Sequence, residues 1–503
     1  MDLWANISYG FQIGLMPVNL AYCFIGCLMG TLVGVLPGIG PAATIALLLP
    51  TTFRLPPVSG IIMLAGIYYG AMYGGSTTSI LVNIPGEAGS VVTCLDGHQM
   101  ARKGRAGAAL GIAAFGSFIA GTISVVGMMV LAIPLAKVAL KFGFPEYFAL
   151  ICLGLSIVSY LGQGSIFKSL LMAALGLSIS FIGMDMVTGK FRFNFGLMVL
   201  GDGVGLIPLI MGLFGISEVF LNIDEKTKAT QIFKTRVKEL LPTLQDWKDS
   251  IGPILRGSLL GFSIGNIPGG GADVSSFLSY ALEKRISKHP EKFGTGVIEG
   301  VAGPEAANNA GAGGAFIPLF VFGIPGNAAT ALLLGALMIH GLQPGPLLLT
   351  QHPEIFWGTV ASMYIGNAML LVLNLPLIGM WVRLLKVPYR ILFPLILLFC
   401  LIGAYSENNN AFDLLVMLFF GVVGYVFRKY GYSLVPMVLA FVLGQRMEQS
   451  LRQSLILSDG SFLIFFTRPI CAVALALAFF LLISSLFPSF KRKRKEIEKA
   501  VAE

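Results

Sequence analysis

Long apolar runs, interrupted only by short polar connections, occupy almost the whole chain. A transmembrane helix needs roughly 20 predominantly apolar residues, and runs near this length recur along the 503 residues. Charged residues make up only 12% of the chain, whereas a soluble domain carries about 25%. A soluble protein of this composition would expose large apolar patches and aggregate. The sequence therefore predicts a polytopic membrane protein.

These runs predict an all-α fold with about 10 to 14 membrane elements, since a helix satisfies its own backbone hydrogen bonds in lipid. Several are too short, or too often interrupted by Gly and Pro, to be simple spans, so we expect broken or re-entrant helices. The candidate segments are approximately residues 11–36, 58–82, 106–136, 146–162, 166–186, 204–221, 251–281, 296–323, 328–342, 355–385, 391–405, 411–427, 433–446 and 462–488.

A polar stretch at residues 222–250 separates two groups of apolar segments. It holds six Lys and Arg residues together with several acids. We therefore divide the chain into an N-terminal membrane repeat (1–221), this linker, a C-terminal membrane repeat (251–490) and a basic tail (491–503).

The basic residues behind the net charge of +9 lie in short connections, such as residues 102–105 and 491–495. Cytoplasmic loops of membrane proteins have this distribution, so we expect no nucleic-acid partner. The tail is expected in the cytoplasm, and so is the Lys-rich linker. The first residues lack a basic region and a cleavage site, so no cleavable signal peptide is expected.

Two Pro-Gly motifs of the first half recur in the second half in the same order. Residues 36–41 (LPGIGP) resemble residues 267–272 (IPGGGA), and the first prolines of these motifs are 231 residues apart. Residues 83–88 (NIPGEA) resemble residues 323–328 (GIPGNA), whose prolines are 240 residues apart.

A third, weaker match pairs residues 144–147 with residues 387–390. Because all three matches keep their order, we interpret the chain as one duplicated unit. Internal duplication is typical of secondary transporters, and matching Gly/Pro interruptions are the best pointer to their binding site. We expect the two repeats to be inverted, although the number of segments leaves a parallel relation open.

The first motif is incompatible with an unbroken helix. Pro37 and Pro41 lack backbone N–H groups, and the glycines between them favour backbone angles that other residues avoid. We expect a helix to end before Pro37 and another to begin near Pro41. The free N–H groups of the new helix suit a carboxylate. A simple kink or a surface loop is the alternative.

Hydroxyl and amide side chains follow within apolar segments of both halves. Residues 76–79 (STTS) place four hydroxyls in a row, which can hydrogen-bond a carboxylate without adding charge. Packing between helices is the alternative role. In the second half, residues 303–311 (GPEAANNAG) contain one acid and two amides, and the amides suit either a carboxylate or a sodium ion.

An ionisable side chain at membrane depth costs about 3 kcal/mol on insertion scales and points to function. The alternative for Glu305 is a place at the membrane surface, paired with Lys or Arg. The candidate cation-coupling residues are Asn266, Asp273 and Glu305. The candidate solute-binding residues are Pro37, Gly38, Gly40, Ser76, Thr77, Thr78, Asn83, Pro85, Gly86, Pro268, Gly269, Gly270, Asn308, Asn309, Pro325, Gly326 and Asn327. We expect the four Pro-Gly breaks to meet near the middle of the bilayer.

Nothing in the sequence indicates an enzyme. The six cysteines and four histidines lack the spacing of a metal site, and no nucleophile–base pair is apparent. The phosphate-binding motif Gly-x-x-x-x-Gly-Lys-Ser/Thr does not occur. We expect no cofactor other than a coupling sodium ion or proton. A channel or receptor without ion coupling, or an intramembrane enzyme, are the alternative functions.

Three long motifs carry a family resemblance. They are residues 34–40 (GVLPGIG), 69–86 (YGAMYGGSTTSILVNIPG) and 335–346 (GALMIHGLQPGP). With them the chain resembles the large membrane subunit of the tripartite tricarboxylate transporters, the TctA family. The similarity runs from near residue 15 to near residue 450.

The resemblance implies a transporter of the bacterial inner membrane that works with two partners, a small four-helix membrane subunit and a periplasmic solute-binding protein. The binding protein would deliver a di- or tricarboxylate such as citrate, and a sodium or proton gradient would drive uptake. Which carboxylate is carried, and whether two copies form a dimer, stay open. By analogy with other transporters that have paired re-entrant hairpins, we expect an elevator-like movement of one bundle against a fixed scaffold.

Overall fold

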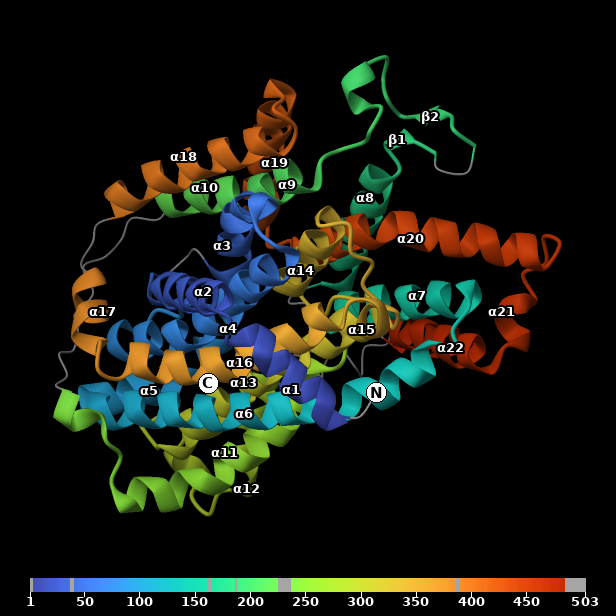
Figure 1. Cartoon of the computed structure of the whole chain (residues 1–503). Coiled ribbons are helices and arrows are strands. Elements are labelled where there is room, and N and C mark those ends of the chain that lie inside the picture. The colour runs from blue at the N-terminus through green and yellow to red at the C-terminus, as the bar shows by residue number, and fades with distance from the viewer. Residues whose placement is uncertain are drawn as a thin grey trace.

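The structure is a computed structural model that describes residues 3–36, 40–161, 165–185, 188–224, 237–385 and 389–484. It is helical almost throughout (Figure 1), as the apolar runs predict. The helices before the polar linker are α1 (Leu3–Gly14), α2 (Pro17–Val35), α3 (Gly40–Leu48), α4 (Pro57–Val82), α5 (Val91–Arg102), α6 (Ala106–Ala139), α7 (Phe144–Leu161), α8 (Ile166–Ser180), α9 (Leu206–Ile210) and α10 (Ser217–Asp224).

The second half contains α11 (Leu244–Gly265), α12 (Gly271–Ile286), α13 (Glu299–Gly314), α14 (Ala328–Ile339), α15 (Leu348–Gln351), α16 (Pro353–Asn374), α17 (Ile378–Leu384), α18 (Tyr389–Asn408), α19 (Ala411–Lys429), α20 (Val435–Leu457), α21 (Ile464–Thr467) and α22 (Pro469–Ser484). The π-helical turns are Met211–Ile216 and Pro318–Phe322. The 3-10 turns are Leu49–Arg54, Ala88–Ser90, Met198–Leu200, Val237–Leu240 and Pro290–Lys292. Strands β1 (Gly183–Met184) and β2 (Phe191–Arg192) pair antiparallel.

Five helices in the described part of the chain are long and apolar enough to cross a membrane: α2, α4, α6, α16 and α19. Six shorter apolar helices accompany them. Both groups together lie within the predicted range of membrane elements. The chain is therefore a multi-pass membrane protein.

Glycines bring α2 against α4 without intervening side chains. A Cβ atom at Gly26, Gly30 or Gly34 of α2 would clash with the carbonyl oxygens of Met63, Ile67 and Ala71 of α4, respectively. These glycines recur every four residues, so they lie along one face of the helix. Close approach through small residues is the usual way in which membrane helices associate.

The same contact occurs in the second half between α11 and α13. There a Cβ atom at Gly257, Gly261 or Gly265 would clash with the carbonyl oxygens of Gly303, Ala307 and Gly311, respectively. The α11 glycines lie 231 residues after those of α2, and their partners lie 240 residues after those of α4. These offsets equal those of the two Pro-Gly motif pairs.

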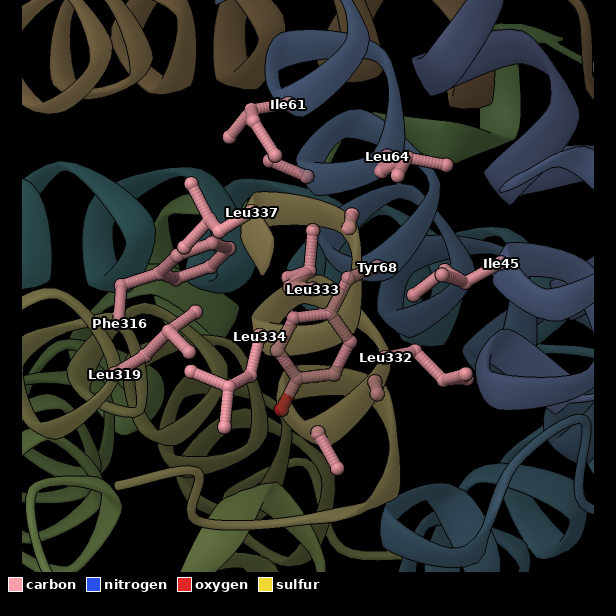
Figure 2. Close-up of a cluster of buried hydrophobic side chains, with 14 of the residues drawn as sticks. Ile45, Ile61, Leu64, Tyr68, Phe316, Leu319, Leu332, Leu333, Leu334 and Leu337 are labelled. Atoms are coloured by element: carbon pink, nitrogen blue, oxygen red, sulfur yellow. The ribbon is translucent and has the colours of Figure 1, made fainter. Parts of the chain in front are cut away.

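A hydrophobic core joins helices from both halves. Figure 2 shows Ile45 of α3 and Tyr68 of α4 with Phe316 and several leucines of α14, and all of these side chains are buried. The aromatic ring of Tyr68 lies among aliphatic side chains, while its hydroxyl oxygen reaches the edge of the cluster. The core therefore holds α4 beside α14, the helix that follows the Pro-Gly motif at residues 323–328.

A second group of helices lies beside this bundle. Helix α20 packs on α7 and α8, and α22 packs on α7. Helices α9 and α10 pack on α19. In Figure 1 the hairpin of β1 and β2 projects beyond the end of α8, and two ion pairs of Arg192 and Arg452, with Glu448 and Asp185, attach it to α20.

One buried carboxylate attaches the loop before α13 to α5. Asp96 accepts hydrogen bonds from the backbone N–H groups of Gly294, Gly296 and Val297 at 2.7–3.1 Å, and from the Tyr280 hydroxyl at 2.9 Å. The loop that precedes α13 therefore lies at the same end of the bundle as α5.

The glycine contacts lead to a stability prediction. Gly261→Ala should lower the apparent melting temperature of the detergent-solubilised chain, because overpacking costs about 1–3 kcal/mol and exceeds the ~1 kcal/mol that alanine adds in helix propensity. Gly252→Ala in the same helix is the control, since the atoms nearest its Cβ belong to the flexible Arg256 side chain. Equal melting temperatures for the two variants would contradict the packing argument.

Candidate functional site

The helix is interrupted at the first Pro-Gly motif of each half, as predicted. Helix α2 ends at Val35 and α3 begins at Gly40, which has a φ of +68°. Helix α11 ends at Gly265 and α12 begins at Gly271, which has a φ of +50°. Left-handed backbone favours glycine, so these residues permit a new helix to start immediately after the break. Pro37 and Gly38 lie outside the described residues.

The Pro-Gly segments that follow α4 (residues 83–87) and α13 (residues 323–327), which we call tips, also adopt the same backbone conformation as each other. Asn83 ends α4 with a φ of +59°, and Gly323 occupies the equivalent place with a φ of +66°. After each tip a capping box starts the next helical turn, formed by Glu87 with Ser90 and by Asn327 with Thr330. Such caps satisfy N–H groups that would otherwise be unpaired inside the bundle.

A side chain from each tip hydrogen-bonds to the helix that precedes the tip of the other half. The Asn308 amide of α13 donates to Oε1 of Glu87 at 2.9 Å. The Asn327 amide donates to the Tyr68 hydroxyl of α4 at 2.6 Å. Tyr68 and Asn308 are 240 residues apart, and so are Glu87 and Asn327. Each contact therefore joins the tip residue of one half to the helix residue of the other half, and the two contacts are equivalent.

Backbone groups connect the breaks to the tips. The Gly269 N–H donates to the Gly326 carbonyl oxygen at 2.8 Å, and the Gly270 N–H donates to the Ile267 carbonyl oxygen at 2.8 Å. In the first half, Gly86 lies directly against the carbonyl oxygen of Gly34, where a Cβ would clash. The breaks and tips of each half are therefore in contact.

Glu305 is fully buried at the centre of a hydroxyl network. Its Oε2 accepts a hydrogen bond from Ser76 of α4 at 2.5 Å, and its Oε1 accepts one from Thr93 of α5. The Asn309 amide, one turn later in α13, donates to the Glu305 carbonyl oxygen at 3.1 Å and to the Ser117 hydroxyl of α6 at 2.6 Å. Four helices thus contribute to this network.

In the part of the chain that the structure describes, the acidic side chains at this site have no basic partners. Within the described ranges, neither Glu305 nor Glu87 forms an ion pair, and both are buried. Glu87 interacts electrostatically with Asp273 and Glu305. Asp273, in the first turn of α12, is exposed. Carboxylates so arranged favour a bound cation or proton, because either one reduces their mutual repulsion.

The structure brings some of the predicted site residues together and separates others. Ser76, Asn308, Asn309 and Glu305 belong to one hydrogen-bonded region, and Thr77 lies next to it. Thr78 instead donates to the Val35 carbonyl oxygen of α2 at 2.7 Å.

The remaining predicted residues lie at the breaks and tips themselves. Asn83 is exposed, while Asn266 and Asn327 are half-buried. Pro85, Pro268 and Gly269 are half-buried, and Gly86, Gly270, Pro325 and Gly326 are buried.

Sequence reasoning missed Glu87, Tyr68, Thr93 and Ser117. A signal for Glu87 was present, because the motif comparison aligned it with Asn327, which was selected. Tyr68, Thr93 and Ser117 lie in apolar or mixed helices where no local pattern distinguishes them.

In the described part of the chain no three His, Cys, Asp or Glu side chains gather into a metal-binding group.

The sequence matches a known protein family over most of its length. Residues 20–439 match the family described as "Tripartite tricarboxylate transporter TctA family". The chain belongs to this family. It is therefore a transport protein of a system that has further subunits.

Two proteins of Agrobacterium vitis are similar to this TctA-family chain. One, described as an uncharacterized 52.8 kDa protein in the TAR-I ttuC' 3' region, is 50% identical over 497 residues, or 99% of both chains. Another, described as an uncharacterized protein in the TAR-II ttuC' 3' region, is 49% identical over 241 residues, or 48% of this chain and 98% of its own length. No solved structure matches the chain.

The contact between Asn308 and Glu87 leads to a second stability prediction. Asn308→Leu should lower the melting temperature, because losing a donor to a buried carboxylate costs about 1–3 kcal/mol. Gln245→Leu removes the same kind of bond, from Gln245 to Asp249, but neither of these two side chains is buried. Its melting temperature should change little, and a larger loss in Gln245→Leu than in Asn308→Leu would refute the prediction.

Proposed function

We propose that this chain is the large membrane subunit of a cation-coupled secondary transporter that takes up small di- or tricarboxylates. The observation that carries this proposal is the pair of buried carboxylates, Glu87 and Glu305, beside two sets of broken helices. A small four-helix membrane subunit and a periplasmic solute-binding protein are its proposed partners, as the family description supports.

We propose further that the chain consists of two inverted repeats. The recurrence of glycine contacts at offsets of 231 and 240 residues supports a duplication. The exchanged contacts of Glu87 with Asn308 and of Tyr68 with Asn327 support a two-fold relation between the repeats, since such an axis makes equivalent residues swap partners.

The distribution of basic residues supports inversion. In the first repeat, Arg102, Lys103 and Arg105 follow the segment of α4 and α5. In the second, residues 284–292 contain four Lys and Arg residues before the segment of α13 and α14, and residues 340–352 after it contain no Lys or Arg. Basic loops face the cytoplasm, so the equivalent segments run in opposite directions. The bonds of Asp96 to the loop before α13 agree, because they hold both basic regions at one end of the bundle.

The solute is proposed to bind where the breaks and tips meet. Exposed or half-buried polar groups there include Asn83, Asn266 and Asn327, which can donate to a carboxylate. The first turn of α12 adds backbone N–H groups that have no intrahelical partner. Ser76 donates its proton to Glu305 instead, so we assign the Glu305 network to the coupling ion.

Coupling is proposed to occur through Glu87, Glu305 and Asp273, with a sodium ion or a proton entering together with the solute. Transport would then proceed by movement of the bundle that holds α2, α4, α11 and α13 against the group of α7, α8, α19 and α20. The protein is proposed to lie in the bacterial inner membrane with its linker and basic tail in the cytoplasm, as their Lys and Arg content favours. The tail lies outside the described residues.

Uptake into proteoliposomes tests this function. The complete transporter, supplied with its binding protein, should accumulate a labelled di- or tricarboxylate only when an inward sodium or proton gradient is imposed. Sodium and pH are varied separately to identify the ion. Uptake that only runs downhill and persists after both gradients are collapsed would exclude coupled transport and favour a channel.

Glu305→Gln should separate coupling from solute binding. The amide keeps the side-chain shape but removes the negative charge, so gradient-driven accumulation should fall at least about tenfold, while exchange of labelled for unlabelled solute continues. Glu299→Gln, in the first turn of the same helix and half-buried, is the control and should accumulate solute normally. Normal accumulation by Glu305→Gln would remove Glu305 from the coupling step.

A further inference from the structure

A small cavity lies between α4, α6 and α16, next to the Glu305 network. Its volume is ≈10 Å³, near the lower limit for holding one water molecule. Tyr73, Ser76 and Thr77 of α4, Ser117 of α6 and Asn374 of α16 contribute the polar part of its lining. A carboxylate solute is too large for this space, but one bare ion or one water molecule fits.

Two hydroxyl groups that line the cavity direct their protons elsewhere. The Tyr73 hydroxyl donates to Oδ1 of Asn367 at 2.5 Å. The Ser76 hydroxyl donates to Oε2 of Glu305 at 2.5 Å. The oxygen atoms of both hydroxyls therefore keep lone pairs that are available to the cavity.

Asn374 contributes an acceptor that lacks a donor. Its Nδ2 donates to the Leu370 carbonyl oxygen at 2.9 Å, which assigns the other amide atom as oxygen. This Oδ1 is buried and has no hydrogen-bond partner among the described residues, and the whole side chain is 6% exposed. A buried acceptor without a partner costs folding free energy. The site therefore favours a ligand that interacts with oxygen lone pairs, either a cation or a hydrogen-bond donor.

We propose that this cavity binds one dehydrated monovalent cation, with sodium as the ion, and that Glu305 balances its charge through Ser76. The inference rests on the proposed cation coupling and names the site of the ion. A water molecule has only two protons to donate, whereas a cation interacts with every oxygen around it. The neighbouring carboxylate has no basic partner in the described ranges, which further favours a cation.

Sodium binding to the purified full chain in detergent tests the site without any transport step. The apparent melting temperature is followed while NaCl replaces choline chloride or KCl at constant ionic strength. Wild type should show a saturable, sodium-specific rise, because a ligand that binds only the folded state stabilises it. No sodium-specific rise would overturn the proposal and indicate that the cavity holds a water molecule only.

Three variants locate the effect. Thr77→Val, Ser117→Ala and Asn374→Leu each remove one oxygen from the lining and should raise the half-saturating sodium concentration at least about tenfold. Ser117→Ala adds no volume, so it gives a result even if Asn374→Leu does not fold. Thr31→Val is the matched control, because Thr31 is equally buried and its hydroxyl is unpaired among the described residues, but it does not line the cavity. Unchanged half-saturation in all three cavity variants would overturn the proposal.

The proteoliposome assay separates this inference from the proposed function. Sodium-driven carboxylate uptake, combined with unchanged sodium titrations in the cavity variants, would refute the cavity and leave the transporter. Loss of sodium binding in the variants, in a complex that takes up no carboxylate, would support the cavity and refute the proposed solute.

Discussion

A helix that ends inside a membrane leaves backbone N–H and C=O groups that lipid cannot satisfy. This chain interrupts its helices near residues 36–40, 83–87, 266–270 and 323–327, and the rest of the structure supplies partners for those interruptions. Glu87 and Asn327 cap the helical turns that follow the tips, and the Gly326 carbonyl oxygen accepts from the Gly269 N–H. The polar groups gathered for this purpose are also those that a solute and an ion would use.

Close packing makes these interruptions possible. The glycine faces of α2 and α11 place each helix directly on the backbone of α4 or α13, so the broken and the continuous helix act as one unit. The breaks after α2 and α11 are thereby held at fixed positions along α4 and α13, respectively. Since Glu87 reaches Asn308 and Asn327 reaches Tyr68, each unit is also attached to the other through a side chain at its tip. The proposed coupling region therefore lies where the two units meet.

The Pro-Gly motifs predicted the breaks and tips because the missing N–H group and the left-handed backbone are local properties of the chain. The row of hydroxyls at residues 76–79 was harder to interpret. Successive residues of a helix point about 100° apart, so Ser76 faces Glu305 of α13 while Thr78 faces Val35 of α2. Adjacent hydroxyl residues thus hydrogen-bond to different neighbouring helices. Only the packing of the helices determines which residue contacts which helix. Contacts such as Tyr73 with Asn367, 294 residues away, have no local signature at all.

The distribution of charge distinguishes two environments within the same site. Asp273, beside a break, and Asn83, at a tip, are exposed, so a hydrated anion can approach them. Glu305 is instead enclosed by hydroxyls that leave no room for a carboxylate. An anionic solute near Glu87 and Asp273 would be repelled unless a positive charge arrived with it. That repulsion gives a physical reason for coupling: the cation lowers the electrostatic cost of binding the carboxylate, and the carboxylate in turn raises the affinity for the cation, because linkage between two ligands is reciprocal.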